Sequence, residues 1–365
     1  MSDLAYKANA GEVVERLRSL YERRASDRIF ATFSVPGDGK EPLAAFRKTH
    51  SEGPCDYPDP SERIQFWDRL LREATLVEDD SLRYAYLTEM DQGLYGGLLG
   101  GDVRFNCNPH TGWISSMVPP LLKDWSDFDR LHFSKSHPWF GRYLAQLRVF
   151  VEGARGKFGV CPFVLINGLN FVFELVGATE TYTSLLDCPD TVRKAMEFGF
   201  DVNVAVQDAF FENVPLFQGG TFSLGCQWIP GRIIMESVDP FHMTSVAYFE
   251  EWGRAPLERV FARYDGGEVH LHGNGRHLLE AVSTVTGLKA IQLGDDTGFP
   301  QAFAVLDELR SRSGSVPLVV SVGFKDFADK LTRHQLHGGV LYRVNGAPNA
   351  DAANRCMEEV RAYRR

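Results

Sequence analysis

The chain has 365 residues, of which 24% are charged and 44% hydrophobic, values typical of a folded globular protein and not of a disordered one. Its 39 lysines and arginines are outnumbered by 48 aspartates and glutamates, which gives a formal net charge of −9. Such a chain is poorly suited to bind nucleic acid or anionic membranes, because both are held mainly through Lys and Arg. It has no run of 18 apolar residues and no export signal, so we expect a cytoplasmic protein with six free cysteines.

Eight short runs of β-branched, aromatic and aliphatic residues predict eight strands. They cover residues 29–35, 82–87, 163–167, 215–219, 268–272, 289–294, 316–322 and 339–344. Their near-continuous apolar character is typical of strands that are buried on both faces of a parallel sheet. Helical patterns lie between them, and the clearest cover residues 61–74, 189–211, 239–264 and 349–365.

The alternation of strands and helices predicts right-handed βαβ units, and eight such strands predict an α/β protein with a (β/α)8 TIM barrel. We expect one domain over residues 29–365, preceded by a helical extension over residues 1–28. An open doubly wound sheet is the alternative. That fold normally has a glycine-rich phosphate loop after its first strand, and residues 35–40 match no such loop. In a barrel, the chemistry lies at the carboxyl ends of the strands.

Two histidines at the end of one predicted strand give the strongest indication of chemistry. His270 and His272 are two residues apart, so they project to the same face of the strand and can chelate one divalent cation. A hydrogen-bonded pair of histidines without a metal is the alternative. The next strand ends at Asp295, which would complete a set of two histidines and one carboxylate, unless it caps the following helix.

Polar residues at the ends of other strands are further candidates. Glu89 and Asp91 follow the second strand, and each is either a site acid or a surface acid. Asp239 starts a predicted helix and is either a site acid or a helix cap. Arg343, near the end of the last strand, can hold a carboxylate through two hydrogen bonds or pair with one of these acids. Two amides at the end of the third strand are candidates for orienting a ligand: Asn167 and Asn170.

Four segments of the sequence, taken in chain order, carry a resemblance to a known superfamily. They are LLGGDVRF at residues 98–105, GLNFVFELVG at 168–177 with the helix after it, EVHLHGNG at 268–275 with the strand that follows, and residues 338–360. In this order they resemble segments of the uroporphyrinogen decarboxylase superfamily, which also contains zinc-dependent methyltransferases that act with corrinoid proteins. The resemblance covers most of residues 84–360 and implies the same barrel.

The match to the decarboxylases themselves is mixed. Asp91 falls at the spacing of their catalytic aspartate, but their active-site tyrosine falls near Phe173, which has no hydroxyl. Their arginine motif after the first strand has no counterpart in this chain. Uroporphyrinogen carries many carboxylates, and a pocket without those arginines would hold it poorly. The sequence therefore argues against uroporphyrinogen as the substrate.

The match to the methyltransferases implies a metal site. Their zinc is held by a His-x-Cys pair, which resembles His270 and His272 here, and their next ligand position falls beside Asp295. Their distal cysteine position falls on Val344 or Asn345, and we take Asn345 as a candidate for substrate binding. The resemblance thus implies zinc or another divalent metal, with a corrinoid protein or a folate as the methyl carrier.

Three functions remain open on these observations. The first is a metal-dependent methyltransferase that acts on a small molecule, with His270, His272 and Asp295 as metal ligands. The second is a metal-free decarboxylase or other lyase, in which Asp91 is the acid and Arg343 holds a carboxylate. The third is a barrel that binds a ligand and has lost its chemistry.

Overall fold

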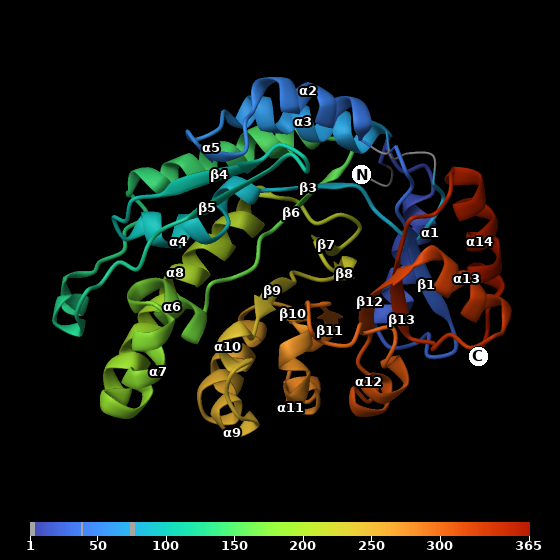
Figure 1. Ribbon diagram of the computed structural model, residues 1–365. Helices are drawn as coiled ribbons and strands as arrows, with labels where there is room; N and C mark the ends of the chain where they lie inside the picture. Colours follow the sequence, from blue (N-terminus) through green and yellow to red (C-terminus); the bar gives the residue numbers. More distant parts are fainter. Residues whose placement is uncertain (1–3, 38, 74–76) are drawn as a thin grey trace.

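The computed structural model describes residues 4–37, 39–73 and 77–365, and its largest element is a parallel sheet of six strands (Figure 1). The strands follow the order β1 (Ile29–Phe33), β13 (Val340–Asn345), β12 (Leu318–Gly323), β11 (Leu288–Leu293), β10 (Gly267–Leu271) and β9 (Ile234–Ser237). Their apolar residues are almost entirely buried, as expected for strands covered on both faces. The predicted α/β class with a parallel sheet is confirmed.

Two further parallel strands, β3 (Tyr84–Tyr86) and β6 (Gly159–Cys161), pair with each other. On one side, Val164 forms a parallel bridge with Met235 of β9. On the other side, the backbone N–H of Asp80 donates to the carbonyl oxygen of Ala31 in β1 at 2.9 Å. The β3–β6 pair therefore lies between the two edge strands of the six-stranded sheet.

Helices surround these strands and cover their outer side (Figure 1). They are α1 (Ala10–Tyr21), α2 (Lys40–Thr49), α3 (Pro60–Glu73), α4 (Gln92–Leu98), α5 (Pro138–Ala154), α6 (Leu169–Val176), α7 (Ala178–Asp187), α8 (Pro189–Asn213), α9 (Val246–Tyr248), α10 (Arg254–Arg263), α11 (Leu279–Ser283), α12 (Leu306–Arg312), α13 (Phe324–Thr332) and α14 (Ala350–Ala362). Local sequence fixes several ends: Pro189 occupies the first turn of α8, and the Asn349 side chain accepts a hydrogen bond from the Ala352 N–H to cap α14. No helix of the described residues is long and apolar enough to cross a membrane, and all six cysteines are free.

A β-hairpin made of β7 (Gly220–Ser223) and β8 (Gln227–Pro230) lies beside the parallel strands, near the centre of Figure 1. The Ser223 hydroxyl donates to Glu268 Oε1 of β10 at 2.6 Å, and the Tyr21 hydroxyl of α1 donates to the Cys226 carbonyl oxygen at 2.7 Å. Trp228 of the hairpin is fully buried. We call the side of the parallel strands that faces this hairpin the inner side.

Three antiparallel strands form a separate small sheet above α4 in Figure 1. They are β2 (Gly53–Cys55), β4 (Arg104–Asn108) and β5 (Trp113–Met117). The sheet and the adjacent helices α2 and α3 enclose a second apolar cluster: Phe46, Phe66, Phe105, Cys107 and Ile114. The sequence patterns did not predict this sheet.

Three of the predicted elements are wrong in detail. Residues 163–167 form no strand: only Val164 makes an isolated bridge, and the strand in this part of the chain is β6, which ends at Cys161. Residues 215–219 form no strand, and the strand after α8 that joins the parallel sheet is β9, which was not predicted. The predicted helix over residues 239–264 is broken into a 3-10 turn at Asp239–Phe241, the short α9, a π-helical turn at Phe249–Gly253 and α10. Ala74, which ends the predicted helix over 61–74, and residues 1–3 of the predicted extension lie outside the described residues.

Candidate functional site

The two predicted histidines face each other at the carboxyl end of β10. His270 Nε2 lies 3.1 Å from His272 Nε2, and the two rings are nearly perpendicular. Glu268 is on the same strand and its carboxylate bonds to the hairpin, so alternation along the strand puts all three side chains on the inner side. Burial lowers the pKa of His270, and the nearby His272 lowers it further.

A carboxylate fixes the orientation of His272. His272 Nδ1 lies 2.9 Å from Asp296 Oδ1, and the other oxygen of Asp296 accepts the Gly273 N–H at 2.6 Å. A carboxylate can only accept, so Nδ1 of His272 carries a proton, and in the neutral form of the ring Nε2 has a lone pair. The hydrogen bond from His272 holds the pKa of Asp296 below its usual value.

Asp239 and His242 lie on the loop that follows β9 and approach the same pair. Asp239 Oδ1 is 3.7 Å from His272 Nε2 and 3.6 Å from His242 Nδ1. His242 is buried, which lowers its pKa to about 4 against the opposing effect of Asp239, and its Nε2 has no hydrogen-bond partner in the described chain. A side chain at Gly275 would collide with the His242 ring, so glycine permits this packing. Sequence reasoning missed His242.

Asp295 does not point toward the histidines. Its Oδ1 accepts hydrogen bonds from Arg276 at 3.1 Å and from the Ala302 N–H at 2.6 Å, and Arg276 also donates to the Gly294 carbonyl oxygen. The acid that contacts the histidine pair from this strand end is instead Asp296. Within residues 4–37, 39–73 and 77–365, no group of three or more His, Cys, Asp or Glu side chains is arranged to hold a metal ion.

Asp91 is a half-buried acid on the loop after β3. Burial raises its pKa to about 7, although the Tyr86 hydroxyl donates to its Oδ2 at 3.4 Å. Burial likewise raises the pKa of Glu174 to about 7, and the charge of Asp91 adds to that shift. These two carboxyl groups therefore hold protons near neutral pH.

Glu89 is enclosed by protein groups. It forms a buried ion pair with Arg63, and Gln146 Nε2 donates to its Oε2 at 2.9 Å. Both of its oxygens thus have protein partners.

The two candidate amides hold the end of β9. Asn167 Nδ2 donates to Glu236 Oε1 at 3.2 Å, and Asn170 Nδ2 donates to the Ser237 carbonyl oxygen at 3.0 Å. Glu236 is fully buried, and burial raises its pKa to about 8. These contacts stabilise the backbone that leads to Asp239.

Arg343 and Asn345 line one pocket near the carboxyl ends of β1 and β13. The pocket has a volume of about 320 Å³ and is also lined by Thr32, Ser34 and Tyr84. Arg343 is half-buried, and Asn345 is exposed. The structure therefore brings Arg343 and Asn345 together in one pocket. The acids Asp295 and Glu89 do not line that pocket.

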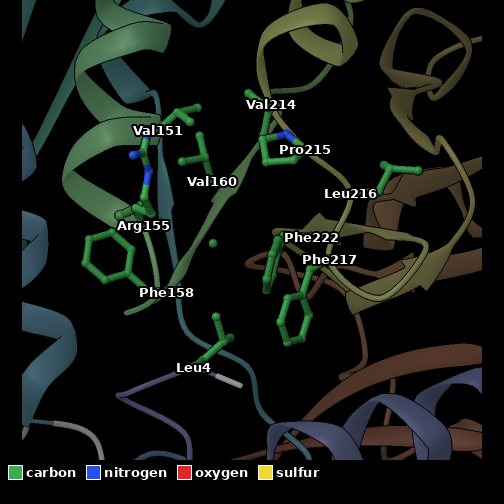
Figure 2. A pocket seen from close by; sticks show the side chains of 13 residues that line it. Leu4, Val151, Arg155, Phe158, Val160, Val214, Pro215, Leu216, Phe217 and Phe222 are labelled. Carbon is green, nitrogen blue, oxygen red and sulfur yellow. The ribbon is translucent and has the colours of Figure 1, made fainter. Parts of the chain in front are cut away.

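A second cavity of about 310 Å³ lies at the other end of the strands, beside the start of β6 and the end of α5 (Figure 2). Its wall is apolar, with side chains such as Phe158, Val160 and Phe222 pointing into it, and Arg155 is its one charged lining residue. Among the residues that the structure describes, no acid, histidine, cysteine or hydroxyl side chain lines it. This cavity offers no acid–base or metal-binding group.

Comparisons with known proteins relate the chain to solved structures but to no family model. No protein-family model matches the sequence, and no curated protein sequence is detectably similar to it. Among solved structures, a methyltransferase from Methanosarcina mazei superposes with a TM-score of 0.60 over 96% of this chain and 98% of its own, at 13% sequence identity. The chain shares the fold of that methyltransferase. At this identity the likeness concerns the fold alone.

Proposed function

We propose that this protein is a metal-dependent methyltransferase built on a (β/α)8 barrel. Support for the barrel comes from the β3–β6 pair, which connects β9 to β1 through the Val164 bridge and the Asp80 hydrogen bond. Support for methyl transfer comes from the shared fold with the Methanosarcina mazei enzyme and from the resemblance of residues 84–360 to a superfamily that contains methyltransferases.

The observation that carries the proposal is the distance between the two histidine nitrogens. Two nitrogen ligands 2.0–2.1 Å from a tetrahedral zinc ion lie about 3.3 Å apart. His270 Nε2 and His272 Nε2 are 3.1 Å apart, and the Nε2 of His272 presents a lone pair because Asp296 holds the proton on Nδ1. Two neutral imidazoles at this separation fit the bite of one divalent metal ion.

The third protein ligand that we propose is Asp239. Its Oδ1 is 3.7 Å from His272 Nε2, and its side chain is 47% exposed, so a small rotation of the side chain can bring the oxygen to the metal. Asp295 is less suitable, because Arg276 and the Ala302 N–H already occupy its oxygen. Two histidines and one carboxylate leave positions free for a substrate.

The roles of the chain's own residues follow from this arrangement. His270 and His272 would bind the ion, Asp296 would orient His272, and burial would keep His270 neutral and therefore able to bind. A bound divalent ion acts as a Lewis acid that activates a coordinated heteroatom of the substrate. The substrate would be a small molecule.

The rim of the site suits a methyl carrier. Met243 is 84% exposed and follows His242, and Phe299 is 47% exposed and lies beside Gly273. Both side chains are exposed and apolar, and they lie near the polar site. We propose that a corrinoid protein or a folate delivers or accepts the methyl group here.

Metal analysis of protein that carries no histidine tag tests the proposal. After incubation with zinc and gel filtration, wild-type protein is expected to retain about one equivalent, and H270A/H272A less than about a tenth of it. The matched control is H110A/H132A, which removes two exposed histidines and is expected to behave like the wild type. Zinc far below one equivalent in every wild-type preparation would contradict the proposal.

A decarboxylase or other lyase is the second candidate, and the raised pKa of Asp91 favours it. A carboxyl group with a pKa of about 7 can donate a proton at neutral pH, and Asp91 has such a value because it is buried. Release of CO2 from small carboxylic acids, followed with labelled substrate, is expected to fall by about 100-fold or more in D91N. Undiminished release in D91N would remove Asp91 from the mechanism.

A further inference from the structure

We propose that Arg343 binds the carboxylate of a small monoanionic ligand in the pocket at the ends of β1 and β13. The inference deepens the proposed function, because it names the chemical class of the substrate, and to that extent it rests on that function. The binding itself requires neither metal nor methyl transfer and is testable without them.

The Arg343 guanidinium has N–H donors, but no acceptor of another described residue bonds to them. Within the described residues its guanidinium makes no hydrogen bond, and no carboxylate oxygen lies within 4.0 Å of it. The side chain is half-buried and lines the pocket. A guanidinium has five N–H donors in a planar fork that matches a carboxylate, and Arg343 presents its fork to the pocket that it lines. A ligand carboxylate would satisfy them.

The nearest acid does not neutralise Arg343. Glu268 is close enough for the two charges to interact, but it lies beyond ion-pair distance and its Oε1 is occupied by the Ser223 hydroxyl. Glu268 is buried among the hairpin residues, and burial raises its pKa and so favours its uncharged form. The positive charge of Arg343 therefore remains available to the pocket.

Other unpaired polar groups line the same pocket. The Trp67 indole Nε1–H is buried without a hydrogen-bond partner in the described chain, and the Thr32 hydroxyl and the Asn345 amide form no side-chain hydrogen bonds there either. The Tyr84 hydroxyl, in contrast, already donates to the Leu224 carbonyl oxygen. The Thr32 hydroxyl gives a carboxylate a donor in addition to Arg343.

The pocket selects a small anion of low charge. Its volume of about 320 Å³ is at the lower end of the range for ligand sites, and Leu71, Phe33 and Val344 give it apolar walls. No first turn of a helix contributes to its lining, so the usual backbone cradle for phosphate is missing. Arg83 also lines it, but its charge acts on Asp79 as well. A carboxylate with a short apolar chain fits this combination.

The pocket faces the same interior as the histidines. The positive charge of Arg343 acts to lower the pKa of Glu268. Glu268 precedes His270 by two residues and shares its side of β10. A ligand held by Arg343 thus enters the inner side of the strands, where the proposed metal ligands project.

Titration calorimetry with butyrate, and with butyramide as its uncharged counterpart, tests the proposal. Wild-type protein is expected to bind butyrate at least about tenfold more tightly than butyramide or inorganic phosphate. R343Q is expected to weaken butyrate binding by about tenfold or more, and R343K by less, because lysine keeps the charge but loses the planar fork. R142Q removes an exposed arginine in another part of the chain and is expected to leave binding unchanged. Thermal unfolding of each variant checks that it is folded.

The outcomes separate this inference from the proposed function. Absence of butyrate binding, equal binding of butyramide, tighter binding of phosphate, or unchanged binding in folded R343Q would each overturn the inference. The same titrations in H270A/H272A are expected to show butyrate binding within about twofold of wild type, since Arg343 and not the histidine pair holds the carboxylate. Wild-type protein that retains no zinc after incubation with it, but still binds butyrate through Arg343, would contradict the proposed metal site and leave this inference standing.

Discussion

Glu89→Ala is expected to lower the free energy of unfolding by about 3–5 kcal/mol, because it leaves the charge of Arg63 buried without a counter-ion. Both side chains of this ion pair are almost completely inaccessible. Arg63 also donates to the Gly112 carbonyl oxygen at 2.9 Å, and it lies 5.0 Å from the Phe66 ring, so it cannot easily turn toward water. The pair connects α3 to the turn that leads into α4.

Urea denaturation of wild-type and E89A protein measures this effect. Asp102→Ala is the matched control, because it removes one partner of an exposed ion pair with Arg104 and is expected to change the stability by less than about 0.5 kcal/mol. An E89A variant within 1 kcal/mol of the wild type would show that Arg63 finds another partner.

The free energy of unfolding is expected to fall as the pH rises from about 4.5 to about 8, chiefly because of Glu236. The folded state raises the pKa of this buried carboxyl from 4.5 to about 8, whereas the unfolded chain restores the ordinary value. Between these values the unfolded state has lost a proton that the folded state keeps, so rising pH favours unfolding. The full loss is on the order of 5 kcal/mol, since one pKa unit corresponds to about 1.4 kcal/mol. Asp91 and Glu174 act in the same direction up to about pH 7.

Urea titrations of the wild type and E236Q at pH 5.5, 7 and 8.5 test this expectation. Glutamine keeps an oxygen to accept from Asn167 but has no proton to lose, so E236Q is expected to lose distinctly less stability over that range. Glu358→Gln, at an exposed position, is expected to follow the wild-type curve. If the free energy of unfolding changed equally with pH in all three proteins, Glu236 would not titrate as proposed.

The parallel strands could be predicted from the sequence where they are long and apolar. β10, β11, β12 and β13 are continuous buried runs, and each lies where the pattern places it, within one or two residues. β9 was missed because it has only four residues and ends in Glu236 and Ser237, which look like loop residues. Residues 215–219 look like a strand because Leu216 and Phe217 are apolar, but they lead into the hairpin instead.

The candidate site shows what alternation can and cannot predict. His270 and His272 face each other as their two-residue spacing predicts. The same alternation applied from Gly294, which lies against His270, would have selected Asp296 and not Asp295. Asp239 and His242 depend on a 3-10 turn after β9, and no local pattern predicts how such a turn approaches another strand end.

The pairing of the first and last strands has a consequence for how the protein is made. Ile29 pairs with Val340, and Phe33 pairs with Val344, so β1 gains this sheet neighbour only after residues 340–344 have left the ribosome. Until then β1 and β12 both present unpaired backbone edges, which are prone to associate with other chains. Contacts so distant in sequence also slow folding. Chains that stop before β13 are therefore expected to expose these edges and to aggregate more readily.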